Sequence, residues 1–348
     1  SPDPKVRLQV LYTLDGLGLL TADLIALALV DRHPAVREHA VRLSEVHLRE
    51  AESPGKATSQ ERPGMQRLVE QLLRRVSDPS VRVRFQLAFS LGEWGDPRAA
   101  RALTALAVRN PENVDIQNAV VSSAFPHVDS MLDVINTGIG EIFSATFLKE
   151  VFRLAAISRD EPTRLKAISH LTRVEARVTT GQSFTALEGF LEGVEHRNGS
   201  LEQLQSEASP ELKRSTERLQ SLFRLAREIA LETNHNEDER VTAIRVLGRG
   251  ASGREDDLNS LADLLTPRSS IRVQRAVLDS LVRSYPAQGA RVLLQGWRAH
   301  GPSIRDHVLN MLLSRSEWID LLLAEIEAGK IAVGQIGPVY RQRLLGHG

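Results

Sequence analysis

A helix-opening motif that recurs along the chain constrains the fold more than any other feature of the sequence. Four segments read Pro-x-Val/Ile-Arg, with an apolar residue three places after the arginine: residues 4–7, 34–37, 79–82 and 302–305. Proline at the first helical position gives up an amide that would be unpaired there anyway, and its φ is already helical. The Val or Ile and the residue four places later then share one helix face, which we expect to be buried.

The arginine of each motif is expected to have a structural role. We predict that it pairs with an aspartate of a neighbouring repeat and so forms a ladder along the stack, in preference to binding a ligand. The predicted ladder consists of Arg7, Arg37, Arg82, Arg305, Asp31 and Asp78. Asp3 and Asp78 each precede a proline and are also placed to cap exposed helix amides.

Helices recur in pairs between these openings. The expected helices are 5–17, 21–30, 36–49, 65–76, 81–91, 97–108, 116–125, 130–142, 145–157, 163–174, 240–247, 258–265, 273–284, 290–298, 304–313 and 318–328, with a loop over 52–64. The motif spacing of roughly 30 to 45 residues is the period of HEAT and armadillo arrays, in which one pair cannot bury its apolar face alone. The sequence therefore predicts an all-α fold, an α-α superhelix of HEAT- or armadillo-like repeats.

Residues 179–234 depart from the repeat pattern. Ser209-Pro210-Glu211 is a good helix start, but residues 200–209 are polar and rich in Gln and Glu. We expect longer, irregular helices here that divide two sub-arrays. The predicted domains are N-terminal repeats over 1–178, irregular helices over 179–234 and C-terminal repeats over 235–348.

Charge and cysteine content narrow the classes of function. The 44 basic residues balance 44 acidic ones, whereas nucleic-acid-binding proteins usually carry a basic excess or stripe, so we expect no nucleic-acid partner. There is no cysteine, which excludes disulfides, thiolate metal sites, a cysteine nucleophile and c-type haem attachment within these residues. An apolar run at residues 24–30 is too short to span a bilayer, and we expect no membrane contact.

Histidine and tryptophan supply the candidate contact residues. His33 and His39 are six places apart and do not share a helix face, and no His-Glu-x-x-His motif occurs, so no metal site is predicted. His39 and His307 occupy the same repeat position, after Arg-Glu and Arg-Asp, and are assigned to a repeat surface. Trp94, beside two glycines at a helix end, is the candidate for an exposed contact, while helical periodicity places Trp297 and Trp318 in the core.

Two further motifs are interpreted as structural. The glycine-rich residues 248–253 follow a helix instead of a strand, so they read as a helix stop and a loop and not as a dinucleotide fingerprint. Glu237-Asp238-Glu239 and Asp256-Asp257 read as acidic helix starts, which the helix dipole favours. No catalytic, cofactor-binding or metal-binding residue is predicted.

Several longer stretches carry a resemblance to a known family. They are Leu187-Glu188-Gly189-Phe190-Leu191-Glu192-Gly193 with Asn198-Gly199-Ser200-Leu201, Trp297-Arg298 leading to Leu313-Ser314-Arg315, and Trp318-Ile319 with Ile326-Glu327-Ala328-Gly329-Lys330-Ile331 and Arg341-Gln342-Arg343-Leu344-Leu345-Gly346-His347. Through them the chain resembles, over nearly its whole length, the HEAT-like middle region of planctomycete-type membrane-bound dehydrogenases, also described as haem-binding CxxCH proteins.

The resemblance implies partners that lie outside this chain. Such proteins place a dehydrogenase-like β-propeller before the helical region and a cytochrome c domain after it, and haem c and a quinone cofactor or Ca²⁺ would belong to those flanking domains. It also implies a periplasmic or exported location. None of the family's redox residues matches a position in this chain, so none is carried over, and no cofactor is expected within it.

We therefore expect a non-catalytic scaffold, not an enzyme, that spaces the propeller and haem domains for electron transfer and binds those domains or another protein. The alternative is a HEAT-like nucleic-acid-binding protein or an enzyme of the DNA glycosylase type. That alternative needs a basic groove with aromatic and acidic residues projecting into it.

Overall fold

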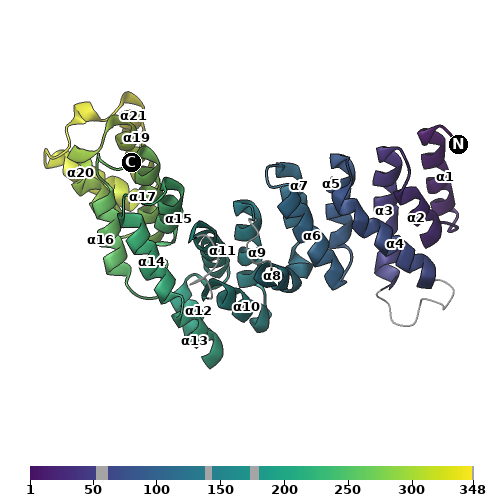
Figure 1. The fold of residues 1–348 in the computed structure, drawn as a ribbon. Coiled ribbons are helices and arrows are strands. Elements are labelled where there is room, and N and C mark those ends of the chain that lie inside the picture. The colour runs from purple at the N-terminus through teal and green to yellow at the C-terminus, as the bar shows by residue number, and fades with distance from the viewer. Residues whose placement is uncertain (52–61, 138–142, 173–179, 347–348) are drawn as a thin grey trace. The chain divides into compact units, whose positions relative to one another are not determined.

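The computed structural model describes residues 1–51, 62–137, 143–172 and 180–346, and every regular element within these ranges is a helix (Figure 1). The chain divides into two compact units. Unit 1 is Ser1–His170 with Glu175–Val178, and unit 2 is Leu171–Val174 with Thr179–Gly348. Each unit is a stack of antiparallel helix pairs, so the predicted all-α helical-repeat solenoid is confirmed.

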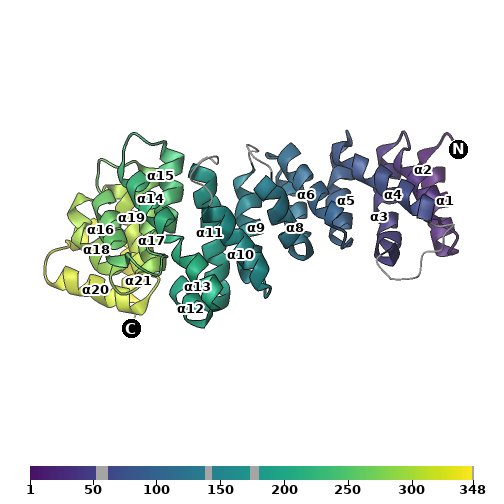
Figure 2. The same ribbon diagram turned by 60° about the horizontal axis from the view of Figure 1, so that its bottom comes forward.

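Unit 1 holds the helices α1(Pro4–Gly16), α2(Ala22–Leu29), α3(Pro34–Ala51), α4(Arg62–Arg74), η1(Arg75–Ser77), α5(Val81–Gly92), α6(Pro97–Arg109), α7(Val114–Ser122), η2(Phe125–His127), α8(Val128–Thr137), α9(Ala145–Ile157) and α10(Glu161–Thr172). Its first helices α1, α3, α5, α7 and α9 contact one another in succession, with the second helices beside them (Figure 2). The predicted helices of this unit lie within a few residues of the observed ones, apart from 138–142 and 173–174, which lie outside the described residues.

Unit 2 holds α11(Thr180–Asn198), α12(Leu201–Glu207), α13(Pro210–Glu217), α14(Gln220–Leu231), α15(Glu237–Val246), α16(Arg254–Leu264), α17(Ile271–Ser284), α18(Gly289–Gln295), η3(Trp297–Ala299), α19(Pro302–Leu312), α20(Ser316–Glu327), η4(Val333–Gln335) and α21(Pro338–Leu345). Helices α15, α17 and α19 contact one another in succession. Helices α11 and α14 both pack on α15, so the irregular segment and the C-terminal repeats form one unit and are not separate bodies.

The third and seventh residues of a first helix form the buried seam of the stack. In six of these helices both positions are at most 3% exposed: Val36 and Ala40, Val83 and Leu87, Ile116 and Val120, Phe147 and Val151, Val273 and Val277, Ile304 and Val308. Burying an aliphatic side chain of this size stabilises a fold by about 1.5–3 kcal/mol. Because each of these six helices contributes two such residues, the seam holds successive repeats together.

Two of the four sequence motifs do not follow this pattern. In α1, Val6 and Val10 are 47% and 50% exposed, because no helix pair covers this face within the described residues. In α5, Val81 and Phe85 are 44% and 37% exposed, against the expectation that they are buried. The reason is a shift of two residues: Ser80 is the extended residue before the helix, so α5 begins at Val81 and not at Pro79.

Several local expectations are met by the cap geometry. The side chains of Asp3, Thr21 and Ser209 accept hydrogen bonds from the amides of Lys5, Leu24 and Leu212, in the first turns of α1, α2 and α13. Within the expected loop over 52–64, residues 52–61 lie outside the described residues, whereas residues 62–64 belong to α4. The polar stretch after Gly199 forms the short helix α12, because Leu201 and Leu204 are buried on one side of it.

Two left-handed glycines offer a test of packing in unit 2. Gly248 has φ of +76°, and a Cβ added there would lie 2.5 Å from Cε2 of Tyr285, whereas Gly329 has φ of +69° and open space around it. We expect Gly329→Ala to lower the free energy of unfolding by about 1–2 kcal/mol, the cost of the left-handed backbone alone. Gly248→Ala is expected to lower it by about 3 kcal/mol or more, because the methyl group also displaces a buried ring. Urea denaturation of both variants checks this, and equal losses would contradict the packing around Gly248.

Candidate functional site

The fourth residue of many first helices is a donor that caps the preceding segment. Arg37 donates from Nη1 to the carbonyl of Asp31 at 2.9 Å, and Gln117 donates from Nε2 to the carbonyls of Ala107 and Asn110 at 2.8 and 2.9 Å. The residues that act in this way are Arg7, Arg37, Arg84, Gln117, Arg240, Gln274 and Arg305. Since helix ends and the turns after them leave carbonyls without backbone partners, these donors satisfy groups that burial would otherwise make costly.

Two of these arginines also form the predicted pairs with aspartate. Arg37 holds Asp78 through two parallel hydrogen bonds, Nε to Oδ2 at 2.8 Å and Nη2 to Oδ1 at 2.7 Å, and the two side chains are 9% and 0% exposed. Asp78 also accepts from Nη1 of Arg75 and from the amide of Ser80. Arg7 holds Asp31 in the same two-pronged way at 2.6 and 2.7 Å, in a partly exposed position.

The other two arginines of the predicted ladder take different partners. Arg82 is 75% exposed and pairs with Glu38 of α3 at 3.1 Å, because the shifted start of α5 puts Arg84 in the inward position. Arg305 lies over the ring of Trp297, 5.6 Å from its centroid, and donates to the carbonyls of Trp297 and Arg298 in place of a carboxylate.

Trp94 is not the exposed contact residue that the sequence predicted. It is 2% exposed, in the corner where the chain turns from α5 into α6, and the guanidinium of Arg98 lies 5.0 Å from its ring. Asp96 holds that guanidinium through hydrogen bonds to both terminal oxygens. The indole ring fills the turn between α5 and α6 and excludes water from it. A position beside glycines at a helix end therefore did not indicate that the side chain is exposed. Trp297 and Trp318 are each 1% exposed, as predicted for core residues.

The two histidines at the same repeat position both reach the preceding first helix. Nδ1 of His39 lies 2.7 Å from the hydroxyl of Tyr12 in α1, and Nε2 of His307 lies 3.7 Å from Oδ1 of Asp279 in α17. Both side chains are partly exposed. Among the residues that the structure describes, no group of three or more His, Cys, Asp or Glu side chains is arranged to hold a metal ion.

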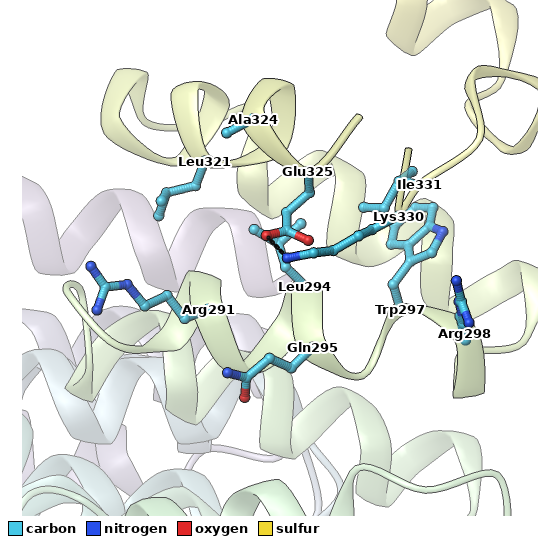
Figure 3. Close-up of a pocket in the computed structure, with 10 residues that line it drawn as sticks. All are labelled: Arg291, Leu294, Gln295, Trp297, Arg298, Leu321, Ala324, Glu325, Lys330 and Ile331. Carbon is cyan, nitrogen blue, oxygen red and sulfur yellow. Dashed lines mark hydrogen bonds and ion pairs between the residues drawn. The ribbon is translucent and has the colours of Figure 1, made fainter. Parts of the chain in front are cut away.

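A hollow lined by both apolar and charged side chains lies in unit 2 (Figure 3). It has a volume of about 360 Å³ and is lined by α18, η3, α20 and the segment that follows α20. This volume is within the range of small ligand sites, about 300–1,000 Å³. The apolar part of its lining is formed by Leu294, Leu321, Ala324 and Ile331.

Trp297 anchors one wall of this hollow. Its indole Nε1 donates to Oε1 of Gln335 at 2.9 Å, and the guanidinium of Arg305 lies over its ring. Ile331, next to it, is 2% exposed, so the segment after α20 is fixed against η3. This wall is therefore packed into the unit through buried side chains.

Charged side chains surround the apolar surface. Arg291 and Arg298 are exposed and lie at opposite ends of it, while Lys330 and Glu325 point toward each other between them (Figure 3). Nζ of Lys330 is 3.0 Å from Oε1 of Glu325. We define these four residues as the charged rim. It carries three cations and one carboxylate, in a chain whose formal net charge is zero.

The sequence does not reveal the charged rim, although two of its residues stand in stretches that carry the family resemblance. Arg298 and Lys330 belong to the stretches that carry the family resemblance, but a short linear stretch does not show that both line one hollow. No sequence feature distinguishes Arg291 from the many other arginines of this chain.

A second hollow, of about 420 Å³, lies on unit 1 between α3, α5 and α7. Its lining includes Arg42, Glu45, Phe89 and Glu93, and Phe89 is 40% exposed. Its charged lining consists of one arginine and two glutamates, so this hollow does not favour an acidic ligand.

The comparisons with known proteins are sparse. No family model and no curated protein matches the chain. Among solved structures, an engineered protein from a structural genomics consortium is similar over 98% of this chain and 91% of its own length, with 14% identity and a TM-score of 0.27. A similarity that weak informs neither the fold nor the function. None of the described helices is both long enough and apolar enough to cross a bilayer.

The buried Arg37–Asp78 pair is expected to matter more for stability than an exposed pair. Asp78→Asn should lower the free energy of unfolding of unit 1 by about 3 kcal/mol, because it leaves the Arg37 guanidinium buried without its counter-charge. Asp23→Asn removes the exposed partner of Arg67, whose pair is 63% and 51% exposed, and should cost at most about 1 kcal/mol. Chemical denaturation at neutral pH compares the two, and a similar small loss in both would contradict the role given to Asp78.

The same carboxylates predict how stability depends on pH. The hydrogen bond from Arg7 lowers the pKa of Asp31; burial by itself raises the pKa of Asp78, but hydrogen bonds from Arg37 and Ser80 outweigh it and lower that pKa. A lowered folded-state pKa contributes stability that is complete above the unfolded-state pKa of about 3.9 and is lost as pH falls through the folded-state pKa. The urea concentration at the midpoint of unfolding should therefore decrease as the pH falls below about 4. It should decrease less steeply in a variant with Asp31→Asn and Asp78→Asn.

Proposed function

We propose that this chain is a non-catalytic HEAT-like scaffold and protein-interaction module. In a longer exported protein it would hold a dehydrogenase-like propeller and a cytochrome c domain at a set distance for electron transfer, in the periplasm or outside the cell. The resemblance of stretches such as Leu187–Gly193 and Trp318-Ile319 to that family supports the identity of the neighbours. The stacked repeats support the spacing role, because each pair contacts only its neighbours and the length of a stack grows with the number of pairs.

The observation that carries the interaction role is an uncovered seam on unit 1. Val6 and Val10 of α1 occupy the positions that are buried in the other first helices cited above, yet they are 47% and 50% exposed. On α2, Leu27 is also exposed, at 68%. An aliphatic face at positions that serve as a repeat interface in six other first helices is suited to dock another helical element.

The charged clusters of unit 2 also fit a scaffold. Asp257, fully buried, accepts from Nε of Arg227 and from the amide of Gly248, and so ties α14 to α16. Asp238 pairs with Arg272 at 2.6 Å and links α15 to α17. Acidic groups that cross-link neighbouring helices in this way serve the fold.

The uncovered seam gives a prediction about stability. The double change Val6→Glu with Val10→Glu should alter the free energy of unfolding by less than about 1 kcal/mol, because both side chains are already in water. The same change at the equivalent positions of α3, Val36→Glu with Ala40→Glu, should unfold unit 1, because it buries two unpaired carboxylates. Circular dichroism during thermal unfolding distinguishes the two variants. If the first pair also unfolds the unit, the face on α1 serves the fold and is not a docking surface.

The absence of catalysis is tested on the purified chain. With dye electron acceptors and a panel of sugars and alcohols as donors, we expect no turnover above that of a heat-denatured sample. Elemental analysis after dialysis should find no stoichiometric metal. Reproducible turnover, or one metal ion per chain, would overturn the proposed function.

A further inference from the structure

The charged rim and the apolar surface between its ends define the kind of ligand that the unit 2 hollow accepts. Arg291 comes from α18 and Arg298 from η3, and their guanidinium groups lie on opposite sides of the apolar lining (Figure 3). A ligand that spans both must carry negative charge at two separated points. The aliphatic lining formed by Leu294, Leu321 and Ile331 favours an apolar group between those points.

The local charge supports an acidic ligand even though acids are abundant nearby. Helix α20 also carries Glu317, Asp320 and Glu327, but these three residues do not line the hollow. Only Glu325 contributes a carboxylate to the lining, and it is paired with Lys330. The two arginines that remain are exposed, and arginine is the side chain best suited to bind a carboxylate through two hydrogen bonds.

We propose that this hollow binds an acidic segment of a protein partner, in which an aliphatic or aromatic side chain lies between two carboxylates. The apolar side chain occupies the aliphatic lining beside Trp297, and the carboxylates bind Arg291 and Arg298. The inference rests on the proposed function as an interaction module and names the chemistry of one partner segment.

Glu325 has a distinct role in this site. In the free protein its carboxylate holds the ammonium of Lys330 across the middle of the hollow (Figure 3). An incoming carboxylate is repelled by Glu325 and competes with it for Lys330. Glu325 therefore weakens binding and favours ligands whose negative charge is strong enough to displace it. Removing the Glu325 carboxylate should raise the binding affinity, whereas removing a cation of the rim should lower it.

The test uses the whole chain and the peptide fluorescein-Gly-Glu-Leu-Glu-Gly-amide, labelled at its amino terminus, whose binding is followed by fluorescence anisotropy at low ionic strength. The matched peptide carries Gln in place of both Glu. We expect measurable binding of the Glu peptide, binding of the Gln peptide at least about tenfold weaker, and progressive loss of the Glu complex as salt is added.

Variants of the charged rim test whether the peptide binds at this hollow. Arg291→Gln with Arg298→Gln should weaken binding of the Glu peptide about tenfold, from two ion pairs that each contribute up to about fivefold. Glu325→Gln should strengthen it about two- to fivefold by the same reasoning. The control is Arg268→Gln with Arg275→Gln, which removes two exposed arginines of unit 2 that do not line the hollow and should leave binding unchanged.

Equal binding of the Glu and Gln peptides overturns this inference, as does an equal effect of the control variant or no binding of the Glu peptide at millimolar concentration. A loss of binding in the Glu325→Gln variant also overturns it, because the carboxylate would then be a ligand-binding group. These readouts are separate from turnover and metal content, so the inference can fail while the scaffold function stands.

Discussion

Burial of the third and seventh residues of successive first helices is the contact on which the rest of the structure depends. In α3 these residues are Val36 and Ala40, and in α19 they are Ile304 and Val308; all four are at most 3% exposed. One helix pair lacks the apolar area to fold alone, so its stability comes from the pair beside it. Because aromatic residues make up only 4% of the chain, small aliphatic side chains form most of this seam, and they let neighbouring helices approach closely.

Burial of the seam leaves backbone carbonyls that need hydrogen-bond donors, and the fourth residue of many first helices supplies them. Each close approach buries the end of the preceding segment, where carbonyls have lost their helical partners, and an arginine or glutamine at this position supplies the missing donors. Arg37 does more, because the same guanidinium also binds Asp78 and fixes the segment that leads into α5. Gln117 makes the carbonyl contacts without a carboxylate, which shows that the recurring requirement is the donor and not the charge.

The candidate binding features lie where this regular pattern ends or is varied. On α1 the seam positions remain uncovered, which leaves aliphatic side chains in water. In unit 2 the guanidinium of Arg305 reaches over the ring of Trp297, and that ring is a fixed wall of the hollow with the charged rim. The proposed interaction surfaces therefore lie at departures from the repeat, and the proposed spacing role rests on the repeat itself.

The sequence by itself determined the helical class and most helix boundaries, and it indicated that motif arginines such as Arg7 and Arg37 pair with aspartates of neighbouring repeats, because proline, capping residues and apolar period act locally. It gave the wrong surroundings for Trp94 and the wrong register for Arg82. Exposure of a tryptophan depends on how the chain turns between two helices. The register of Arg82 depends on where α5 begins, and Ser80, not Asp78, is the extended residue before that helix. The charged rim was decided by tertiary structure alone, because α18, η3 and α20 are brought to one hollow by packing between helix pairs, which no local preference encodes.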